Sequence, residues 1–207
     1  MFITLEGPDG SGKTLQIHLL EEFLTAKGYK VFCGREPGDT FIGEQIRQVL
    51  MDHQNKNMHP RTETLLFCAA RAQLVQEVLK PHLERGDIVL LDRYADSTMA
   101  YQGYGHQFDL DLIRSLLHFA TGGLRPDLTF LLDVDPQTGL ERRQKGGGEW
   151  NRMDAYVLQY HQRVRQGYLE MAQADPQRWK IVDASRQPDV VQSDLREILL
   201  SYLSNLS

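Results

Sequence analysis

Residues 7–14 form a glycine-rich segment of the type that binds phosphate groups. They read Gly-Pro-Asp-Gly-Ser-Gly-Lys-Thr, which fills every fixed position of the pattern GxxxxGK(S/T). The glycines let backbone N–H groups converge on a phosphate, the lysine reaches the terminal phosphates, and the threonine hydroxyl suits Mg²⁺. An apolar run at 2–5 precedes the segment and a helical stripe starting at Leu15 follows it, a context that argues against a chance match. The sequence therefore predicts a protein that handles a nucleoside triphosphate.

Charged residues follow two further strand-like runs, at the points where those runs end. Asp92 and Arg93 follow the run 88–91, and Arg35-Glu36-Pro37-Gly38 follows the run 30–34. Ligands gather at the carboxyl ends of strands in an open parallel sheet. Asp92 is then placed to hold the water shell of Mg²⁺, and Arg93 to fork onto a phosphate. A surface ion pair and an ordinary solvated turn are the alternative interpretations.

A second group of residues suits a nucleotide base. Phe67 and Arg71 are four apart on an expected helix, so a ring that stacks on a base and a guanidinium that binds its edge share one face. A core phenylalanine beside an arginine that reaches solvent is the alternative. Gln102 offers a donor and an acceptor to an imide edge, unless it is a loop glutamine. The loop at 183–185 either lines an adenine pocket or only ends a strand.

Short apolar strands alternate with helical patterns along the chain. The strand-like runs lie at 2–6, 30–34, 88–92, 128–134 and 179–183. The helical patterns lie at 13–27, 43–52, 62–85, 109–121, 153–173 and 189–203. This alternation is typical of a parallel sheet covered by helices on both faces. We therefore expect an α/β fold, a three-layer sandwich of the P-loop NTPase type with about five strands, in a single domain spanning 1–207.

Two stretches depart from this alternation. Residues 53–60 are polar and are expected to form a loop. Residues 144–151 contain three consecutive glycines next to basic residues, which suits a short lid at about 142–152 that closes over phosphates. A plain surface loop is the alternative for this second stretch.

Composition excludes several classes of function. The 207 residues carry a net charge of −5, which argues against nonspecific nucleic-acid binding as the main task. No apolar run is long enough to span a membrane. Cys33 and Cys68 form neither a zinc spacing nor a CxxC pair, and the start of the chain is unlike a signal peptide. We therefore expect reduced core thiols, a cytoplasmic location, and neither nucleic acid nor a membrane as a partner.

The order of the motifs along the chain resembles the thymidylate kinase family. The segments that carry the resemblance are EGPDGSGKT at 6–14, REPG at 35–38, LLFCAARAQ at 65–73, DRYADSTMAYQG at 92–103 and VDAS at 182–185. Many families share the P-loop, whereas the REPG, FxxxR and DRYxxSxxAYQG set is far more specific. The resemblance covers about residues 2–200. It implies transfer of the γ-phosphoryl group of ATP to dTMP, giving dTDP, with Mg²⁺ as cofactor and a homodimer as the usual assembly.

The resemblance also implies roles for individual residues. The ATP side comprises Gly7, Pro8, Asp9, Gly10, Ser11, Gly12, Lys13, Thr14, Arg142, Arg143, Asp183 and Ser185. The dTMP side comprises Asp9, Glu36, Pro37, Arg47, Phe67, Arg71, Arg93, Ser97, Thr98, Tyr101 and Gln102. The residues implied in catalysis are Lys13, Arg93, Asp9 and Arg143. The metal candidates are Thr14, Asp92 (through water) and Asp9.

One position departs from part of the family. One branch carries an arginine in the P-loop where this chain has Gly10, and the other branch supplies arginines from the lid. The lid centre here is Gly146-Gly147-Gly148. Arg143 is therefore the first candidate for the cation that assists transfer, and Lys145 and Arg142 come next. Arg152 is expected instead to anchor the lid.

Three other functions compete with this interpretation. Another nucleoside monophosphate kinase of the same fold is one, although the residues at 67, 71 and 97–102 favour thymine. A regulatory nucleotide switch needs a guanine-reading NKxD-type motif, which the sequence lacks. A non-enzymatic binding module is disfavoured by two apparent phosphate sites in one domain.

Overall fold

Five parallel strands form one sheet in the computed structural model, which describes residues 1–145 and 151–204. The strands are β1 (Phe2–Glu6), β2 (Val31–Arg35), β3 (Ile88–Asp92), β4 (Leu128–Asp133) and β5 (Trp179–Asp183). Their order is β2-β3-β1-β4-β5, so β1 is central and pairs with both β3 and β4. Leu5 lies opposite Asp92 in this register. The sheet therefore brings the segment that follows Glu6 next to the end of β3.

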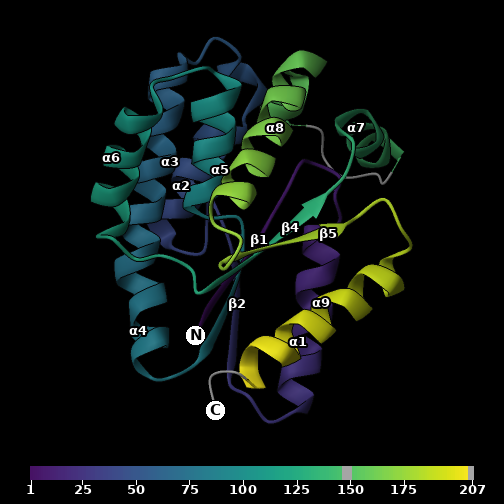
Figure 1. The fold of residues 1–207 in the computed structure, drawn as a ribbon. Coiled ribbons are helices and arrows are strands. Elements are labelled where there is room, and N and C mark those ends of the chain that lie inside the picture. The colour runs from purple at the N-terminus through teal and green to yellow at the C-terminus, as the bar shows by residue number, and fades with distance from the viewer. Residues whose placement is uncertain (146–150, 205–207) are drawn as a thin grey trace.

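Helices cover both faces of the sheet (Figure 1). One face carries α1 (Lys13–Ala26) and α9 (Pro188–Ser204), whose buried leucines pack on alternate residues of the central strands. On the opposite side lie α2 (Phe41–Met51), α3 (Pro60–Leu74), η2 (Val75–Leu79), α4 (Lys80–Glu84), α5 (Ala95–Thr98), η3 (Met99–Gly105), α6 (Leu110–Thr121) and α8 (Leu158–Ala174). The short α7 (Pro136–Lys145) follows β4 at the carboxyl edge of the sheet (Figure 1).

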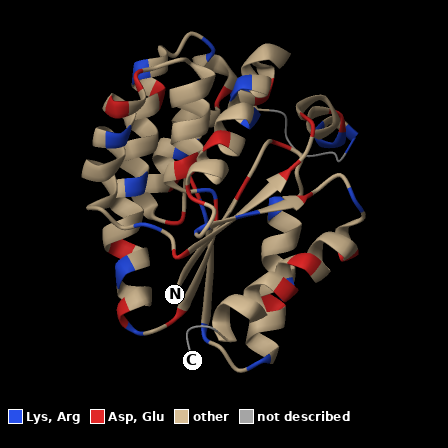
Figure 2. Ribbon diagram, viewed as in Figure 1, with Lys and Arg blue, Asp and Glu red and all other residues tan. Residues whose placement is uncertain are grey.

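The hydrophobic core follows from the continuous apolar strands. Residues of β1, β3 and β4 are buried on both faces of the sheet, because side chains alternate between the two helical layers. Ile3 and Leu5 face α1 and α9, whereas Phe2 packs with Leu74 and Leu79 on the other side. Figure 2 shows the charged residues mainly on the helices and at strand ends, with both signs interspersed.

The α/β class with five parallel strands is confirmed, and the expected strands agree with the observed ones to within a residue or so at each end. Two helical segments were not expected. Residues 95–105 are helical although they contain two glycines, and α7 lacks an apolar stripe. The helix expected at 153–173 is interrupted: a short turn, η4 (Arg152–Ala155), precedes α8, and Tyr156 and Val157 between them are extended.

The expected loop at 53–60, the two cysteines and the membrane-spanning potential of the helices can also be compared with the structure. The polar stretch at 53–60 begins with a single turn, η1 (His53–Asn55), which Asp52 caps. Cys68 is buried and Cys33 half-buried, and both are free thiols. Among the described residues, none of the helices combines the length and the apolar character that crossing a bilayer requires.

Candidate active site

A cavity of about 770 Å³ opens at the carboxyl edge of the sheet. From the P-loop and the ends of β3 and α7 it is lined by Asp9, Gly10, Gly12, Lys13, Thr14, Asp92, Arg93, Arg142 and Arg143. Its other end is lined by Glu36, Pro37, Arg47, Phe67, Arg71, Ser97, Thr98, Tyr101 and Gln102. The structure therefore gathers most of the sequence-predicted site residues around one continuous space.

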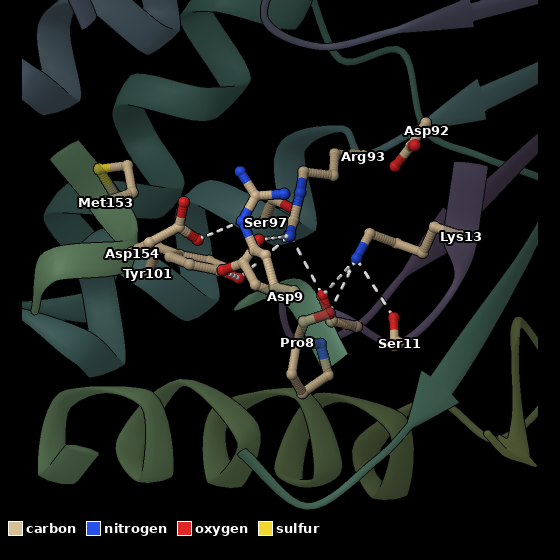
Figure 3. Close-up of polar contacts among 12 residues, drawn as sticks. Pro8, Asp9, Ser11, Lys13, Asp92, Arg93, Ser97, Tyr101, Met153 and Asp154 are labelled. Atoms are coloured by element: carbon tan, nitrogen blue, oxygen red, sulfur yellow. Dashed lines mark hydrogen bonds and ion pairs between the residues drawn. The ribbon is translucent and has the colours of Figure 1, made fainter. Parts of the chain in front are cut away.

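The P-loop lies between β1 and α1. Gly10 and Gly12 adopt φ of +75° and +88°, a region that other residues enter only with strain. The Lys13 Nζ donates to the carbonyl oxygens of Gly7 and Pro8, at 3.0 and 2.9 Å, and to Ser11 Oγ at 3.2 Å (Figure 3). Burial, together with the charge of Arg93, lowers the pKa of Lys13 to about 8. The loop thus concentrates donors and a cation at the start of a helix, where anions bind.

Thr14 and Asp92 meet at the floor of the cavity. The Thr14 hydroxyl donates to Asp92 Oδ2 at 2.9 Å, because the register of β1 and β3 brings the two segments together. A hydroxyl beside a carboxylate is an oxygen donor set of the kind that Mg²⁺ prefers. Asp9, the third metal candidate, is engaged elsewhere.

Asp9 forms an ion pair with Arg93. Arg93 Nη2 lies 2.7 Å from Asp9 Oδ1, and the Tyr101 hydroxyl donates to Asp9 Oδ2 at 2.6 Å. Burial alone would raise the pKa of Asp9, but the charges of Arg93 and Lys13 outweigh it and hold the pKa well below its usual value. Arg93 also donates to the carbonyl oxygen of Gly7 and to Ser97 Oγ. The guanidinium therefore joins the P-loop to the helical segment 95–105 (Figure 3).

Arg71 is buried at the other end of the cavity. Its Nε donates to Glu36 Oε2 at 2.8 Å, its Nη1 to Thr98 Oγ1 at 2.9 Å, and its Nη2 to the Tyr94 carbonyl oxygen at 3.0 Å. The alternative of an arginine that reaches solvent is therefore wrong, because Arg71 is only 1% exposed. Phe67 lines the cavity one helical turn away.

Two more predicted residues line this end of the cavity. Burial raises the pKa of Glu36, although the charge of Arg71 opposes the shift. Within residues 1–145 and 151–204, Glu36 Oε1 has no hydrogen-bond partner. Arg47 donates to the carbonyl oxygen of Pro37 at 2.8 Å, which holds its guanidinium against the turn after β2.

The arginines of α7 have two different partners. Arg142 donates to the carbonyl oxygens of Ala184 and Ser185, at 2.7 and 2.9 Å. Arg142 and Ser185 both line a smaller cavity of about 340 Å³ beside the P-loop, together with Ser11. Asp183 instead closes the turn after β5, where it accepts from the backbone and hydroxyl of Ser185.

Arg143 turns to the larger cavity and donates to Asp154 Oδ1 at 2.5 Å. Arg152 is buried, where it lies 2.7 Å from Glu63 and donates to the Leu50 carbonyl oxygen at 2.9 Å. The proposed lid centre, Gly146 to Gly148, lies outside the described residues.

The backbone of α7 leaves no room for a side chain at position 10 of the P-loop. A Cβ at Gly10 would lie 1.9 Å from the carbonyl oxygen of Gly139 in α7, and one at Gly139 would lie 2.2 Å from the carbonyl oxygen of Asp9. The two backbones therefore touch, and any side chain at position 10 requires α7 to move.

The sequence analysis did not select two buried carboxylates of the site, Glu6 and Glu63. Glu6 is buried and accepts from Tyr94 N, Ser97 Oγ and Tyr168 Oη, and burial raises its pKa to about 7. Glu63 is also buried, and its partners Gln102, His106 and Arg152 come from two other segments of the chain. Glu6 could have been found as a charged residue that ends an apolar run directly before the P-loop. Glu63 lies in the first turn of α3, where the sequence gives no comparable signal.

The fold and the site define a P-loop nucleoside monophosphate kinase. Residues 5–195 match the family model described as thymidylate kinase. The chain is 50% identical to the thymidylate kinase of Roseiflexus castenholzii over 218 residues, covering 100% of this chain and 95% of that one. It is 49% identical to the Deinococcus radiodurans thymidylate kinase over 195 residues, with 94% of each chain covered. The crystal structure of thymidylate kinase from Ehrlichia chaffeensis superposes with a TM-score of 0.77 at 35% identity, covering 96% of this chain and 98% of that one. The chain belongs to the thymidylate kinase family, whose reaction is the ATP-dependent phosphorylation of dTMP.

The lowered pKa of Lys13 predicts a pH dependence. As pH rises through about 8, Lys13 loses its proton and the P-loop loses a positive charge, so kcat/KM for ATP should fall. Tyr101 in the same site has a pKa well above its usual value and stays protonated in this range. Steady-state rates measured from roughly pH 7 to pH 9.5 should show a decline of about tenfold per pH unit at the alkaline end. A pH-independent kcat/KM, with folding verified by circular dichroism at each pH, would contradict the prediction that loss of the Lys13 proton lowers activity.

Proposed function

We propose that the chain transfers the γ-phosphoryl group of ATP directly to a phosphate oxygen of dTMP, using the residues around the larger cavity. The supporting observation is that one cavity joins the P-loop to the pocket of Phe67 and Arg71, with Arg93 between them. Phosphoryl transfer demands alignment and positive charge and little covalent chemistry from the protein. No protein nucleophile is needed, since the acceptor oxygen belongs to the substrate.

On the ATP side, the backbone of 7–14 and the Lys13 ammonium bind the phosphates. Arg142 and Ser185 border the smaller cavity and suit the adenine end, and Asp183 holds the turn that carries Ser185. Thr14 and Asp92, with Asp92 acting through water, would hold Mg²⁺, which supplies charge to the transferring group.

On the dTMP side, Arg93 and Arg47 bind the acceptor phosphate. Arg93 comes to this role already oriented by Asp9 and by Ser97. Tyr101 is held by its hydrogen bond to Asp9. Its proposed role is to crowd the 2′ position of the sugar.

The base itself occupies the far end of the cavity. Phe67 stacks on thymine and Arg71 binds a thymine carbonyl oxygen. The rest of this end is formed by Glu36, Pro37, Ser97, Thr98 and Gln102.

Substitutions at Arg71 and Phe67 should affect dTMP and leave ATP alone. Arg71→Ala removes a charged hydrogen bond worth about 1.5–3 kcal/mol, so KM for dTMP should rise roughly tenfold to hundredfold. Phe67→Ala should act in the same direction through lost stacking, and unlike Arg71→Ala it leaves the buried Glu36 paired. A coupled ADP-release assay with dTMP, dUMP, dCMP and dGMP measures both effects and tests the substrate class. An equal rise in KM for ATP would place these residues elsewhere, and a better acceptor than dTMP would overturn the proposed function.

Arg143 is the proposed cation of the transition state. Arg143→Ala should lower kcat by about 10²–10³ with little change in KM, because a cation that acts on the transferring group stabilises the transition state more than the bound substrates. Arg142→Ala and Lys145→Ala are matched comparisons from the same helix. The carbonyl contacts of Arg142 predict that its loss raises KM for ATP instead. The assignment to Arg143 is wrong if Arg143→Ala keeps the wild-type kcat. It is also wrong if Arg142→Ala or Lys145→Ala lowers kcat more than Arg143→Ala does.

We also propose that the chain is one domain with a lid at about 142–152, works in the cytoplasm and forms a homodimer. The dimer is supported by exposed apolar side chains on the neighbouring helices α2, α3 and α6. Phe119 of α6 is 87% exposed and Phe41 of α2 79%, and Leu65 of α3 and Leu112 of α6 are exposed as well. These helices lie on the same side of the sheet (Figure 1). Large apolar side chains exposed on neighbouring helices are a feature of surfaces that bind another protein chain.

A charge in this apolar group should separate the subunits. Phe119→Glu should sediment as a monomer at concentrations where the wild-type chain is a dimer, because an interface buries such a charge without a partner. Val190→Glu is the matched control, since Val190 is exposed on α9 at the opposite face of the sheet. Sedimentation velocity provides the measurement. A monomeric wild-type chain, or a dimeric Phe119→Glu variant, would contradict the proposal.

A further inference from the structure

Glu63 is a fully buried carboxylate in the first turn of α3, at the edge of the base pocket. Its Oε1 accepts from Gln102 Nε2 at 2.8 Å and lies 3.0 Å from His106 Nε2. Its Oε2 lies 2.7 Å from Arg152 Nη2 and accepts from the Tyr156 hydroxyl at 3.0 Å. Burial pushes the pKa of Glu63 upward, but hydrogen bonds from His106 and Gln102 and the charge of Arg152 outweigh it, so the pKa lies below its usual value. Glu63 is therefore an anion that can only accept hydrogen bonds.

An anionic acceptor fixes the orientation of the Gln102 amide. Only the NH₂ group of the amide can face Glu63, because the carbonyl oxygen would be repelled. Gln102 is 1% exposed and lines the cavity, and within the described residues its Oε1 accepts no hydrogen bond. The oxygen keeps some accessible surface, and because Gln102 lines the cavity, we place that surface in the cavity. The result is a pure acceptor presented to whatever base enters.

The donor pattern of the pocket then distinguishes one pyrimidine edge from the other. Arg71 carries only donors, and Gln102 held in this way presents an acceptor. Thymine offers an acceptor at O4 and a donor at N3, which match this pair. Cytosine offers a donor at N4 and an acceptor at N3, which oppose it at both positions.

We propose that Glu63 is a positioning residue for base specificity, because it locks the Gln102 amide so that its oxygen faces N3–H of thymine. This rests on the proposed function, in which Gln102 contacts the base. A free glutamine could rotate its amide by half a turn and donate from its NH₂ group to N3 of cytosine, which would leave only the opposition between Arg71 and N4. Glu63 removes that freedom, so the pocket rejects a cytosine edge through a residue that does not touch the base.

The test compares kcat/KM for dTMP and dCMP in the wild-type chain and in Glu63→Gln. Glutamine at position 63 keeps the size of the side chain but can donate as well as accept, so the Gln102 amide can adopt both orientations. The ratio of kcat/KM for dTMP to that for dCMP should fall by about tenfold or more, with KM for ATP unchanged. Tyr156→Phe is the matched control. It removes a hydrogen bond to the other oxygen of Glu63 without touching Gln102, and the ratio should stay at the wild-type value.

A second substitution separates an effect through Gln102 from a general loosening of the fold. In a Gln102→Met background, Glu63→Gln should cause no further change in the dTMP to dCMP ratio, since the amide that it controls is gone. An unchanged ratio in Glu63→Gln, or a full effect that persists in the Gln102→Met background, would overturn the proposal.

Two further controls keep the result interpretable. If Gln102→Met alone leaves KM for dTMP and the ratio unchanged, then Gln102 does not read the base, and the failure lies in the proposed function. If Glu63→Gln does not fold, as judged by thermal unfolding, Glu63→Asp takes its place. Aspartate retains the charge opposite Arg152, but its shorter side chain withdraws the acceptor from Gln102, and the ratio should fall in the same direction.

Discussion

The Asp9–Arg93 ion pair is the interaction on which the geometry of this site depends. It joins the P-loop to the end of β3, and Arg93 adopts a left-handed φ of 70° there. Both side chains are largely removed from solvent, so the loss of either would leave an unpaired charge at a cost of about 3–5 kcal/mol. Through Ser97 and Tyr101 the same pair also sets the position of the segment 95–105. The P-loop and the segment 95–105, which lines the far end of the cavity, are therefore connected through one guanidinium.

The distribution of positive charge around this pair suits transfer between two anions. Lys13 lies within the P-loop, Arg93 lies between the two ends of the cavity, and Arg143 comes from α7. Two of these cations, Arg93 and Arg143, are each paired with a carboxylate, whereas the Lys13 ammonium donates to carbonyl oxygens of the P-loop. Asp154 pairs with Arg143, and Asp9 pairs with Arg93. The carboxylates thus fix where these two cations lie before a nucleotide binds.

Local sequence signals were enough to predict the strands of the sheet and the position of the P-loop. The apolar runs that became β1, β3 and β4 are short and continuous, and the P-loop marks the first crossover. Residues 95–105 were harder, because Gly103 and Gly105 weaken a helical signal, and tight packing of Gly105 against Tyr160 supports the helix instead. The same limit applies to the site. Phe67 and Arg71 share one helix face and could be paired from spacing, whereas Glu63 and Arg152 meet only after the chain folds.

The contact between Gly10 and Gly139 links two parts of the enzyme that are far apart in the sequence. Because the P-loop backbone and the first turns of α7 leave no room for a side chain at either glycine, neither segment can be exchanged alone. A chimera that received a P-loop with an arginine at position 10 would need the α7 of its donor as well. The two segments therefore form a single module for recombination, and a designer who wants to add a side chain to the P-loop at position 10 has to replace both together.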